Sequence, residues 1–421
     1  MQLKNSRGKI TGLLATATCS LLNQGALAQT LPGWYIDSAV LAYDEKDRIT
    51  AIEPVVSITR VFDDERILNF KLTLDSLTGA SPNGATISNQ VQTFARPSGR
   101  DTYTTAAGDL PLDDTFKDSR SAVSVQYQFP LDRLTRISAG LAFSEEYDYQ
   151  SLGFNVSVAR DFNNKNTTVS LGLAFASDTI DPEGNIPIPF APTSLLSDAQ
   201  PRLGVEDEKT ITDILFGVTQ VINRRTLMQF NYSFSSSDGY LIDPYKILSE
   251  VDGVSGETLA YRYENRPDSR AKHSLYWKTK YSLDNGNIID FSYRYLWDDW
   301  DIASHTADFR YRVDINDRFY VEPHLRYYTQ EAADFYTHSL VSGQALPAHA
   351  SADPRLGAFD GITYGAKFGY RLNGRSEISL RLELYDQSGD TVGNPIGIQN
   401  DYDLFPDLEA TIVQFSYSYR F

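Results

Sequence analysis

Basic residues recur at every second position in several short segments of the carboxy-terminal half of the chain. Lys278 and Lys280 are two residues apart, as are Arg310 and Arg312. In an extended strand this spacing places the side chains on one face. A basic face that lines a channel favours anionic or zwitterionic solutes. The candidate pore-lining residues are Lys278, Lys280, Arg294, Arg310, Arg312, Arg326, Arg371, Arg381, Glu322 and Glu383.

The same residues have a second interpretation. Acidic side chains such as Asp290 and Asp308 alternate on the same face. The charges could therefore pair with one another and fill a lumen with hydrated ion pairs, without selecting any solute. Spacing alone leaves both interpretations open.

Residue patterns for enzymatic chemistry are weak. Ser304 is adjacent to His305, but neighbouring strand residues point to opposite faces, so the two do not form a nucleophile and base pair. We expect His305, near the end of a strand, to be an interfacial side chain. No convincing catalytic constellation is present, and we expect no enzyme and no cofactor.

Metal ligation is equally weakly indicated. His338 and His349 share one connection with Asp334 and Asp353, but their spacing matches no known zinc site. The acidic segment 178–185 lacks the alternating ligand spacing and the later bidentate Glu of a calcium loop, so a solvated turn is favoured. No metal is expected.

These residues are carried by segments of about ten to fourteen residues with period-two alternation, which is typical of strands with two different faces. In one segment, Leu152, Phe154 and Val156 alternate with Gly153 and Asn155. The pattern predicts about sixteen strands. They lie near 34–43, 49–62, 66–77, 119–130, 134–146, 150–162, 167–177, 210–222, 226–237, 270–283, 288–297, 303–315, 319–330, 359–372, 376–387 and 409–421.

The connections between these strands are of two kinds. Short segments rich in Asn, Asp and Gly, such as 163–166 and 284–287, suit tight hairpin turns because these residues tolerate positive φ. With sixteen strands, the predicted tight turns fall at one end and the long connections at the other, as in transmembrane barrels. The long connections lie near 78–118, 178–209, 238–269, 331–358 and 388–408.

The last strand carries the most specific signal. Phe415, Tyr417, Tyr419 and the terminal Phe421 share one face. Outer-membrane barrels resemble one another in this ending, which the barrel-assembly machinery reads. We interpret these four residues as the assembly signal. A soluble secreted β-sandwich or propeller explains the alternation but neither the two kinds of connection nor the terminal aromatic residue.

The amino-terminal segment has the features of an export signal. Lys4, Arg7 and Lys9 precede an apolar stretch, and a small-residue cleavage site follows at 26–28. We predict a cleaved signal peptide over residues 1–28 and a barrel over 29–421. Cys19, the one cysteine, lies in the signal, so the mature chain is expected to hold no thiol.

Charge excludes one class of partner. The chain has 38 Lys and Arg against 55 Asp and Glu, a net charge of −17. Loss of the basic signal segment makes it more acidic still. Nucleic acid, whose phosphates need a basic surface, is therefore not an expected partner.

Four segments resemble a known family. They are AIEPVVSITRVFDDER at 51–66, SLTGASPNGATISN at 76–89, the ten residues from Pro111 to Arg120, and EYDYQSLGFNVSVARDFNNKNTT at 146–168. Together they resemble the proteobacterial domain-of-unknown-function family numbered 3570 across essentially the whole mature chain. The resemblance implies an outer-membrane barrel. It supplies no substrate and no catalytic residue.

The expected fold is all-β, a transmembrane antiparallel up-and-down β-barrel of about 16 strands in the bacterial outer membrane, with both termini periplasmic. It would contact outer-membrane lipid, lipopolysaccharide and the barrel-assembly machinery. A barrel of this size leaves an aqueous channel unless it is plugged, so we expect a porin-like channel for small polar solutes, with anionic solutes as one option, compatible with a homotrimer. The small residues of 78–118 suit either a constriction folded inward or a plain surface loop. The alternative function is a closed barrel that acts through its outer loops as a receptor, adhesin or envelope-assembly component.

Overall fold

A computed structural model describes residues 31–96, 101–195, 201–391 and 393–421. The predicted signal peptide and Cys19 lie outside these residues. No helix within the described ranges is long and apolar enough to cross a bilayer.

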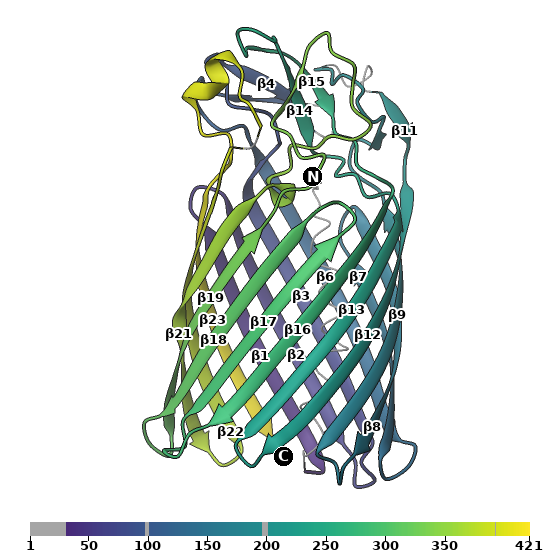
Figure 1. Ribbon diagram of the computed structural model, residues 1–421, viewed down its shortest axis with the longest axis vertical. Coiled ribbons are helices and arrows are strands. Elements are labelled where there is room, and N and C mark those ends of the chain that lie inside the picture. Colours follow the sequence, from purple (N-terminus) through teal and green to yellow (C-terminus); the bar gives the residue numbers. More distant parts are fainter. Residues whose placement is uncertain (1–30, 97–100, 196–200, 392) are drawn as a thin grey trace, which may run out of the picture.

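Sixteen antiparallel strands form one closed barrel, as predicted, and each strand pairs with its neighbours in sheet order (Figure 1). The chain order and the sheet order are the same, which makes the barrel up-and-down. The strands are β1 (Gly33–Glu45), β2 (Ile49–Val61), β3 (Ile67–Pro82), β6 (Leu112–Pro130), β7 (Thr135–Glu145), β8 (Tyr149–Phe162), β9 (Thr167–Ile180), β12 (Asp207–Asn223), β13 (Thr226–Gly239), β16 (Ser269–Ser282), β17 (Ile288–Asp298), β18 (Ala303–Asp314), β19 (Phe319–Gln330), β21 (Phe359–Asn373), β22 (Ser376–Gly389) and β23 (Leu408–Arg420).

Alternation along the strands separates an apolar outer face from a polar inner face. Phe154 on β8 pairs with Phe175 on β9, and both rings are about half exposed on the outer face. Their neighbours Asn155 and Ala174 pair on the inner face and are buried. Exposed apolar side chains on the outside are what a bilayer requires of a barrel.

The barrel closes between its first and last strands. The backbone N–H of Trp34 donates to the carbonyl of Phe421 at 2.7 Å, and the N–H of Phe421 donates to the carbonyl of Trp34 at 3.0 Å. Their rings stack with centroids 6.4 Å apart. The register puts Phe415, Tyr417 and Tyr419 on the outer face of β23. Whether the assembly machinery reads this face stays a prediction.

The two ends of the barrel differ in their connections. One end, which we call the turn end, holds only short connections, at 62–66, 131–134, 163–166, 224–225, 283–287, 315–318 and 374–375. The other, the loop end, holds the long connections 83–111, 181–206, 240–268, 331–358 and 390–407. Short connections are not confined to the turn end, because 46–48, 146–148 and 299–302 lie at the loop end.

The long connections fold over the loop end into one structure, which we call the cap (Figure 1). It has its own buried apolar clusters, one of which holds Phe94, Tyr103 and Tyr263. Its small sheets pair β4 (Gln92–Ala95) with β5 (Thr102–Thr105), β10 (Ile186–Pro187) with β11 (Arg202–Gly204), and β14 (Ile247–Val251) with both β15 (Thr258–Tyr263) and β20 (Ser339–Val341). The 3₁₀ helices η3 (Pro354–Leu356) and η4 (Gly397–Asp401) complete it.

The segment 78–118 is only partly a loop. Strand β3 continues to Pro82, and residues 83–86 then pack beside β14 in the cap. The N–H of Ile247 donates to the carbonyl of Asn83 at 2.9 Å, and the N–H of Thr86 donates to Ser249 Oγ at 3.0 Å. Gly84 has a φ of +96°, and a Cβ there would lie 2.5 Å from the carbonyl oxygen of Ile247. Residues 83–86 therefore belong to the core of the cap, whereas 78–82 and 112–118 extend the barrel strands β3 and β6.

Candidate functional site: the lumen wall and the cap

One side of the lumen is densely charged. Register places the predicted pore-lining residues on the inner face of β16–β19, β21 and β22: Phe291 pairs with Phe309 on the outer face, and Asp290 pairs with Arg310 on the inner face. We call this inner face the charged wall. Its basic members are Arg270, Lys272, Lys278, Lys280, Arg294, Arg310, Arg312, Arg326, Lys367, Arg371 and Arg381, and its acidic members are Asp290, Asp298, Asp308, Asp314, Glu322, Glu377 and Glu383.

Part of the opposite side of the lumen carries small uncharged residues, whereas β2, β3 and β6 beside it carry charged ones such as Asp75 and Arg120. Sheet order places β7, β8 and β9 across the barrel from the charged wall. The middle of their inner face, which we call the neutral wall, consists of Ser138, Gly140, Ala142, Ser144, Ser151, Gly153, Asn155, Ser157, Ser170, Gly172 and Ala174. Small side chains on one wall leave space in front of the long charged ones on the other.

Several basic side chains of the charged wall share one carboxylate. Lys278 Nζ and Lys280 Nζ lie 3.1 and 3.3 Å from the same oxygen of Asp290. Asp314 Oδ1 is likewise 3.4 Å from Arg312 and 3.0 Å from Arg371. One carboxylate cannot neutralise two cations, so pairing leaves positive charge on this wall.

Two of the basic side chains predicted to line the pore form no salt bridge with a described residue. Arg294 and Arg326 are exposed, and among the described residues no carboxylate forms a salt bridge with either. Ion pairing therefore accounts for many of the predicted pore-lining residues but not for these two arginines.

His324 links three strands at the middle of the charged wall. Its Nδ1 lies 2.8 Å from Glu383 Oε1 on β22, and its Nε2 lies 2.8 Å from Asp308 Oδ2 on β18. A neutral imidazole has one N–H, so donation to both carboxylates requires the doubly protonated ring. No pattern along the chain indicates this role, because it depends on cross-strand register.

Tyr320 organises the turn end of the charged wall. Its ring is fully buried, with the Arg312 guanidinium 3.6 Å and that of Arg371 5.6 Å from its centroid. Its hydroxyl donates to Glu377 at 2.6 Å. Gly369 on β21 leaves room for the ring, because a Cβ there would lie 2.0 Å from Tyr320 Cζ. Sequence reasoning missed this cluster for the same reason as His324.

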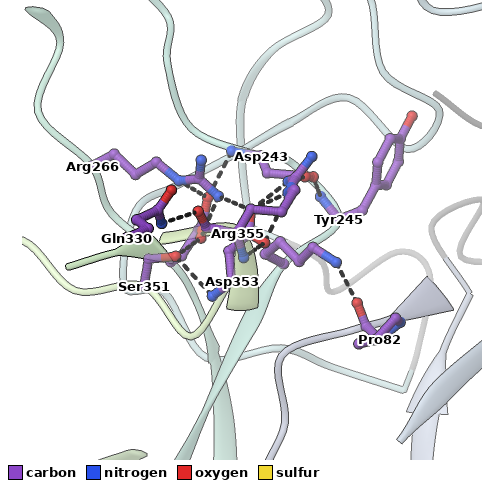
Figure 2. Close-up of polar contacts among 10 residues, drawn as sticks. Pro82, Asp243, Tyr245, Arg266, Gln330, Ser351, Asp353 and Arg355 are labelled. Atoms are coloured by element: carbon purple, nitrogen blue, oxygen red, sulfur yellow. Dashed lines mark hydrogen bonds and ion pairs between the residues drawn. The ribbon is translucent and has the colours of Figure 1, made fainter. Parts of the chain in front are cut away.

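The cap contains a separate, buried charge network (Figure 2). Arg355 Nη2 donates to Asp243 at 2.6 Å, and Arg355 Nε donates to Asp353 at 2.8 Å. Arg266 Nη2 donates to Asp353 at 2.9 Å and to Glu264 at 3.0 Å. The network joins the connection 240–268 to the connection 331–358.

Two further contacts extend this network to neighbouring segments. The Lys246 ammonium donates to the carbonyl of Pro82, at the end of β3. Gln330 Nε2, at the end of β19, donates to the carbonyls of Arg355 and Gly357 at 3.0 and 2.9 Å (Figure 2). The cap is therefore fixed to the barrel on two sides.

Burial and charge act in opposite directions on the acids of this network. Burial alone would raise the pKa of Asp353, but Arg355, Arg266 and Lys246 hold it well below its usual value. The pKa of Asp243 is lowered in the same way, against burial, chiefly by Arg355. Burial raises the pKa of Glu264 despite Arg266.

The residues considered for catalysis or metal binding lie in places that favour neither role. His305 lies on the outer face, where Tyr293 Oη is 2.6 Å from its Nδ1, while Ser304 is on the inner face. Asp178 pairs with Lys209 at 3.4 Å. Asp353 belongs to the cap network. Across the described ranges, no group of three or more His, Cys, Asp or Glu residues is placed to hold a metal ion.

A known family matches nearly the whole chain. The family described as "Protein of unknown function (DUF3570)" matches residues 11–419. The chain belongs to this family. The resemblance of the four sequence segments is thereby confirmed, and the fold is that of an outer-membrane-type β-barrel. No curated protein matches the chain significantly.

Solved barrel structures are similar to the chain only at very low identity. The chain is similar to the "CymD monoaromatic hydrocarbon channel" (8% identity, 96% of this chain and 93% of that chain covered, TM-score 0.41). It is also similar to the Pseudomonas putida toluene transporter TodX (9%, 95% and 94%, 0.40) and to CdiB from Acinetobacter baumannii (8%, 93% and 61%, 0.45). At these values no property of those proteins carries over.

Proposed function

We propose that this protein is a channel of the bacterial outer membrane for small polar solutes, with a preference for anions. In this proposal both termini and the turn end face the periplasm, the cap faces outward, and lipid with lipopolysaccharide surrounds the outer face. The barrel-assembly machinery inserts the chain through its last strand. The assembly could be a homotrimer, as a porin-like barrel allows.

The observation that carries the proposal is the surplus of positive charge on the charged wall. Arg294 and Arg326 are exposed without acidic partners, and two pairs of cations each share one carboxylate. Cationic groups that line a channel raise the local concentration of anions and lower their entry barrier. The neutral wall on β7, β8 and β9 adds no charge of its own.

Selectivity in planar bilayers tests this function. In a salt gradient the reversal potential of the native protein should indicate anion preference. The variant Arg310→Gln/Arg312→Gln/Arg326→Gln should lower the anion-to-cation permeability ratio by about twofold or more. A matched control, Arg133→Gln/Arg224→Gln/Arg318→Gln, removes three arginines from exposed turns at the turn end and should leave the ratio nearly unchanged.

The cap supports a second function, a closed barrel that binds a partner through its outer surface. Long connections that share apolar clusters and a buried charge network form a defined surface rather than loose loops. Folded protein that stays silent in bilayers at every voltage would exclude the open channel and leave this alternative.

A further inference from the structure

The cap contains a cavity of about 310 Å³. Its walls come from the β4–β5 hairpin, from β14 and β15, and from the connection that holds Glu183, Asn185 and Arg202. β4, β14 and β15 lie at the far end of the cap from the barrel (Figure 1). The volume falls at the small end of the range of ligand pockets.

Aromatic rings form one side of this cavity. Phe94 lies between Tyr103 and Tyr261, with ring centroids 5.2 and 4.8 Å away. Phe94 and Tyr103 are buried in an apolar cluster of the cap, and Tyr261 packs against it. These rings also line the cavity, so a ligand there meets an apolar aromatic surface fixed from behind.

The polar side of the cavity has unused hydrogen-bonding capacity. The Arg202 guanidinium donates to the carbonyls of Gly184 and Pro201 and lies 5.0 Å from the Tyr263 ring, but no described carboxylate pairs with it. Glu183 Oε2 is buried and accepts no hydrogen bond. Arg96, by contrast, is paired with Asp114 at 3.1 Å.

A tight turn follows Glu183. Gly184 and Asn185 both have positive φ, +86° and +67°. Glycine and asparagine both tolerate this conformation, so the two residues form a tight turn without strain. The turn brings Glu183, Asn185 and Arg202 to one cavity.

The chemistry of the walls limits the ligand. A wholly apolar ligand would leave the buried Glu183 Oε2 without a partner, which costs about 1–3 kcal/mol. A simple anion would satisfy Arg202 but not Glu183. A ligand with hydroxyl groups supplies both acceptors for Arg202 and donors for Glu183. It must also present an apolar face to the rings.

We propose that this cavity binds one or two pyranose units of a carbohydrate, with Arg202 and Glu183 bonded to ring hydroxyls and Tyr261 against the C–H face of the sugar. A pyranose combines these features, because hydroxyls surround its edge and C–H bonds cover its faces. The sugar is either a free solute or part of a surface glycan. Binding does not depend on an open lumen, so this inference stands apart from the channel function.

Titration calorimetry and saturation-transfer NMR on the folded protein in detergent test the proposal. The probes are glucose, galactose, N-acetylglucosamine, glucuronate and a disaccharide of each. At least one should bind, with saturation strongest at its ring C–H protons. Absence of binding by every probe at about 10 mM would overturn the proposal.

Three variants locate the site. Arg202→Gln and Glu183→Gln should each weaken binding at least about tenfold, and so should Leu259→Trp, which puts a larger side chain on the cavity wall. Leu259 is 58% exposed, so this change does not disturb the packed core. Glu65→Gln and Arg375→Gln, in exposed turns at the turn end, are the matched controls. Binding that survives all three cavity variants would place the sugar elsewhere and overturn the proposal.

Two further experiments identify the source of the sugar and separate sugar binding from the channel function. Purified lipopolysaccharide that competes with the bound probe identifies a surface glycan as the occupant, whereas lack of competition identifies a free sugar. The variant Arg310→Gln/Arg312→Gln/Arg326→Gln, which changes the lumen, should bind sugar as the native protein does. Failure of the channel function and failure of this inference are thus distinguished.

Discussion

Arg266 and Arg355 in the cap are held by buried carboxylates at 2.6 to 3.0 Å, whereas Arg294 and Arg326 in the lumen are exposed and lack a carboxylate partner among the described residues. The residue type is the same but the surroundings are opposite. Removing one partner from a buried network leaves an uncompensated charge in a low dielectric. An exposed charge in a wide lumen is solvated with or without a partner. Charges in the cap therefore hold segments together, whereas in the proposed channel the unpaired arginines of the wall would meet solutes.

The largest expected effect is on the cap. Asp353→Ala removes the carboxylate shared by Arg266 and Arg355 and should destabilise the cap by about 3–5 kcal/mol. Faster cleavage of the cap connections by protease and a lower unfolding temperature would show this loss of stability. Asp334→Ala changes an exposed acid of the same connection and should behave as the native protein. Equal protease resistance of the two variants would mean that the network does not hold the cap.

The second prediction concerns packing within the charged wall. Gly369→Val places a side chain where the Tyr320 ring lies and should destabilise the barrel by about 1–3 kcal/mol, and it should also disturb Arg312 and Arg371. Gly153→Ala on the neutral wall is the control, because its Cβ would meet only ordinary contacts at 3.7 Å. The unfolding midpoints of the two variants should differ clearly. Similar midpoints would contradict the role of Tyr320.

The third prediction concerns Glu146 and Asp148, two buried acids whose pKa values are raised. Burial, then Asp118, raises the pKa of Glu146 to about 8, despite Arg120, and burial raises the pKa of Asp148 to about 6. A raised acid pKa means that the folded state binds protons more readily than the unfolded state. Stability should therefore rise as pH falls from about 8.5 to 5.

The unfolding midpoint should be a few degrees higher at pH 5, and Glu146→Gln should flatten this dependence. The acids of the cap network behave differently in the same window. Asp353 and Asp243 have lowered pKa values, so their contribution is present above about pH 4 and is lost only as the pH falls through their folded values. An unfolding temperature of the native protein that decreases as the pH is lowered from 8.5 to 5 would contradict the raised pKa values of Glu146 and Asp148.

The smallest expected effect is that of removing an unpaired arginine of the charged wall on the free energy of unfolding. Arg326→Gln should change the free energy of unfolding by no more than about 0.5 kcal/mol, because the side chain is exposed and forms no salt bridge with a described residue. The same variant should still reduce anion preference in bilayers. A large loss of stability would show that Arg326 holds the wall together and would remove the contrast with the cap.

The barrel was predictable because its signal is local. In β8, alternation of Leu152 and Phe154 with Gly153 and Asn155 identifies a two-faced strand without knowledge of its partners. The inner placement of Arg310 and Arg326 follows from the same alternation. The cap was not predictable, because Asp243 and Arg355 meet across two connections that show no period. Tyr320 against Gly369 and His324 between two carboxylates depend on the register between strands, which a single sequence does not reveal.

The joint between Trp34 and Phe421 has a kinetic consequence. Ordered strand pairs elsewhere in the barrel join neighbours in the chain, but this one joins the first described strand to the last residue. Until β23 has paired on both sides, β1 and β22 both present unpaired edges that invite aggregation. A prematurely terminated chain cannot hide those edges. The contact between Trp34 and Phe421 thus distinguishes a closed barrel from an open one.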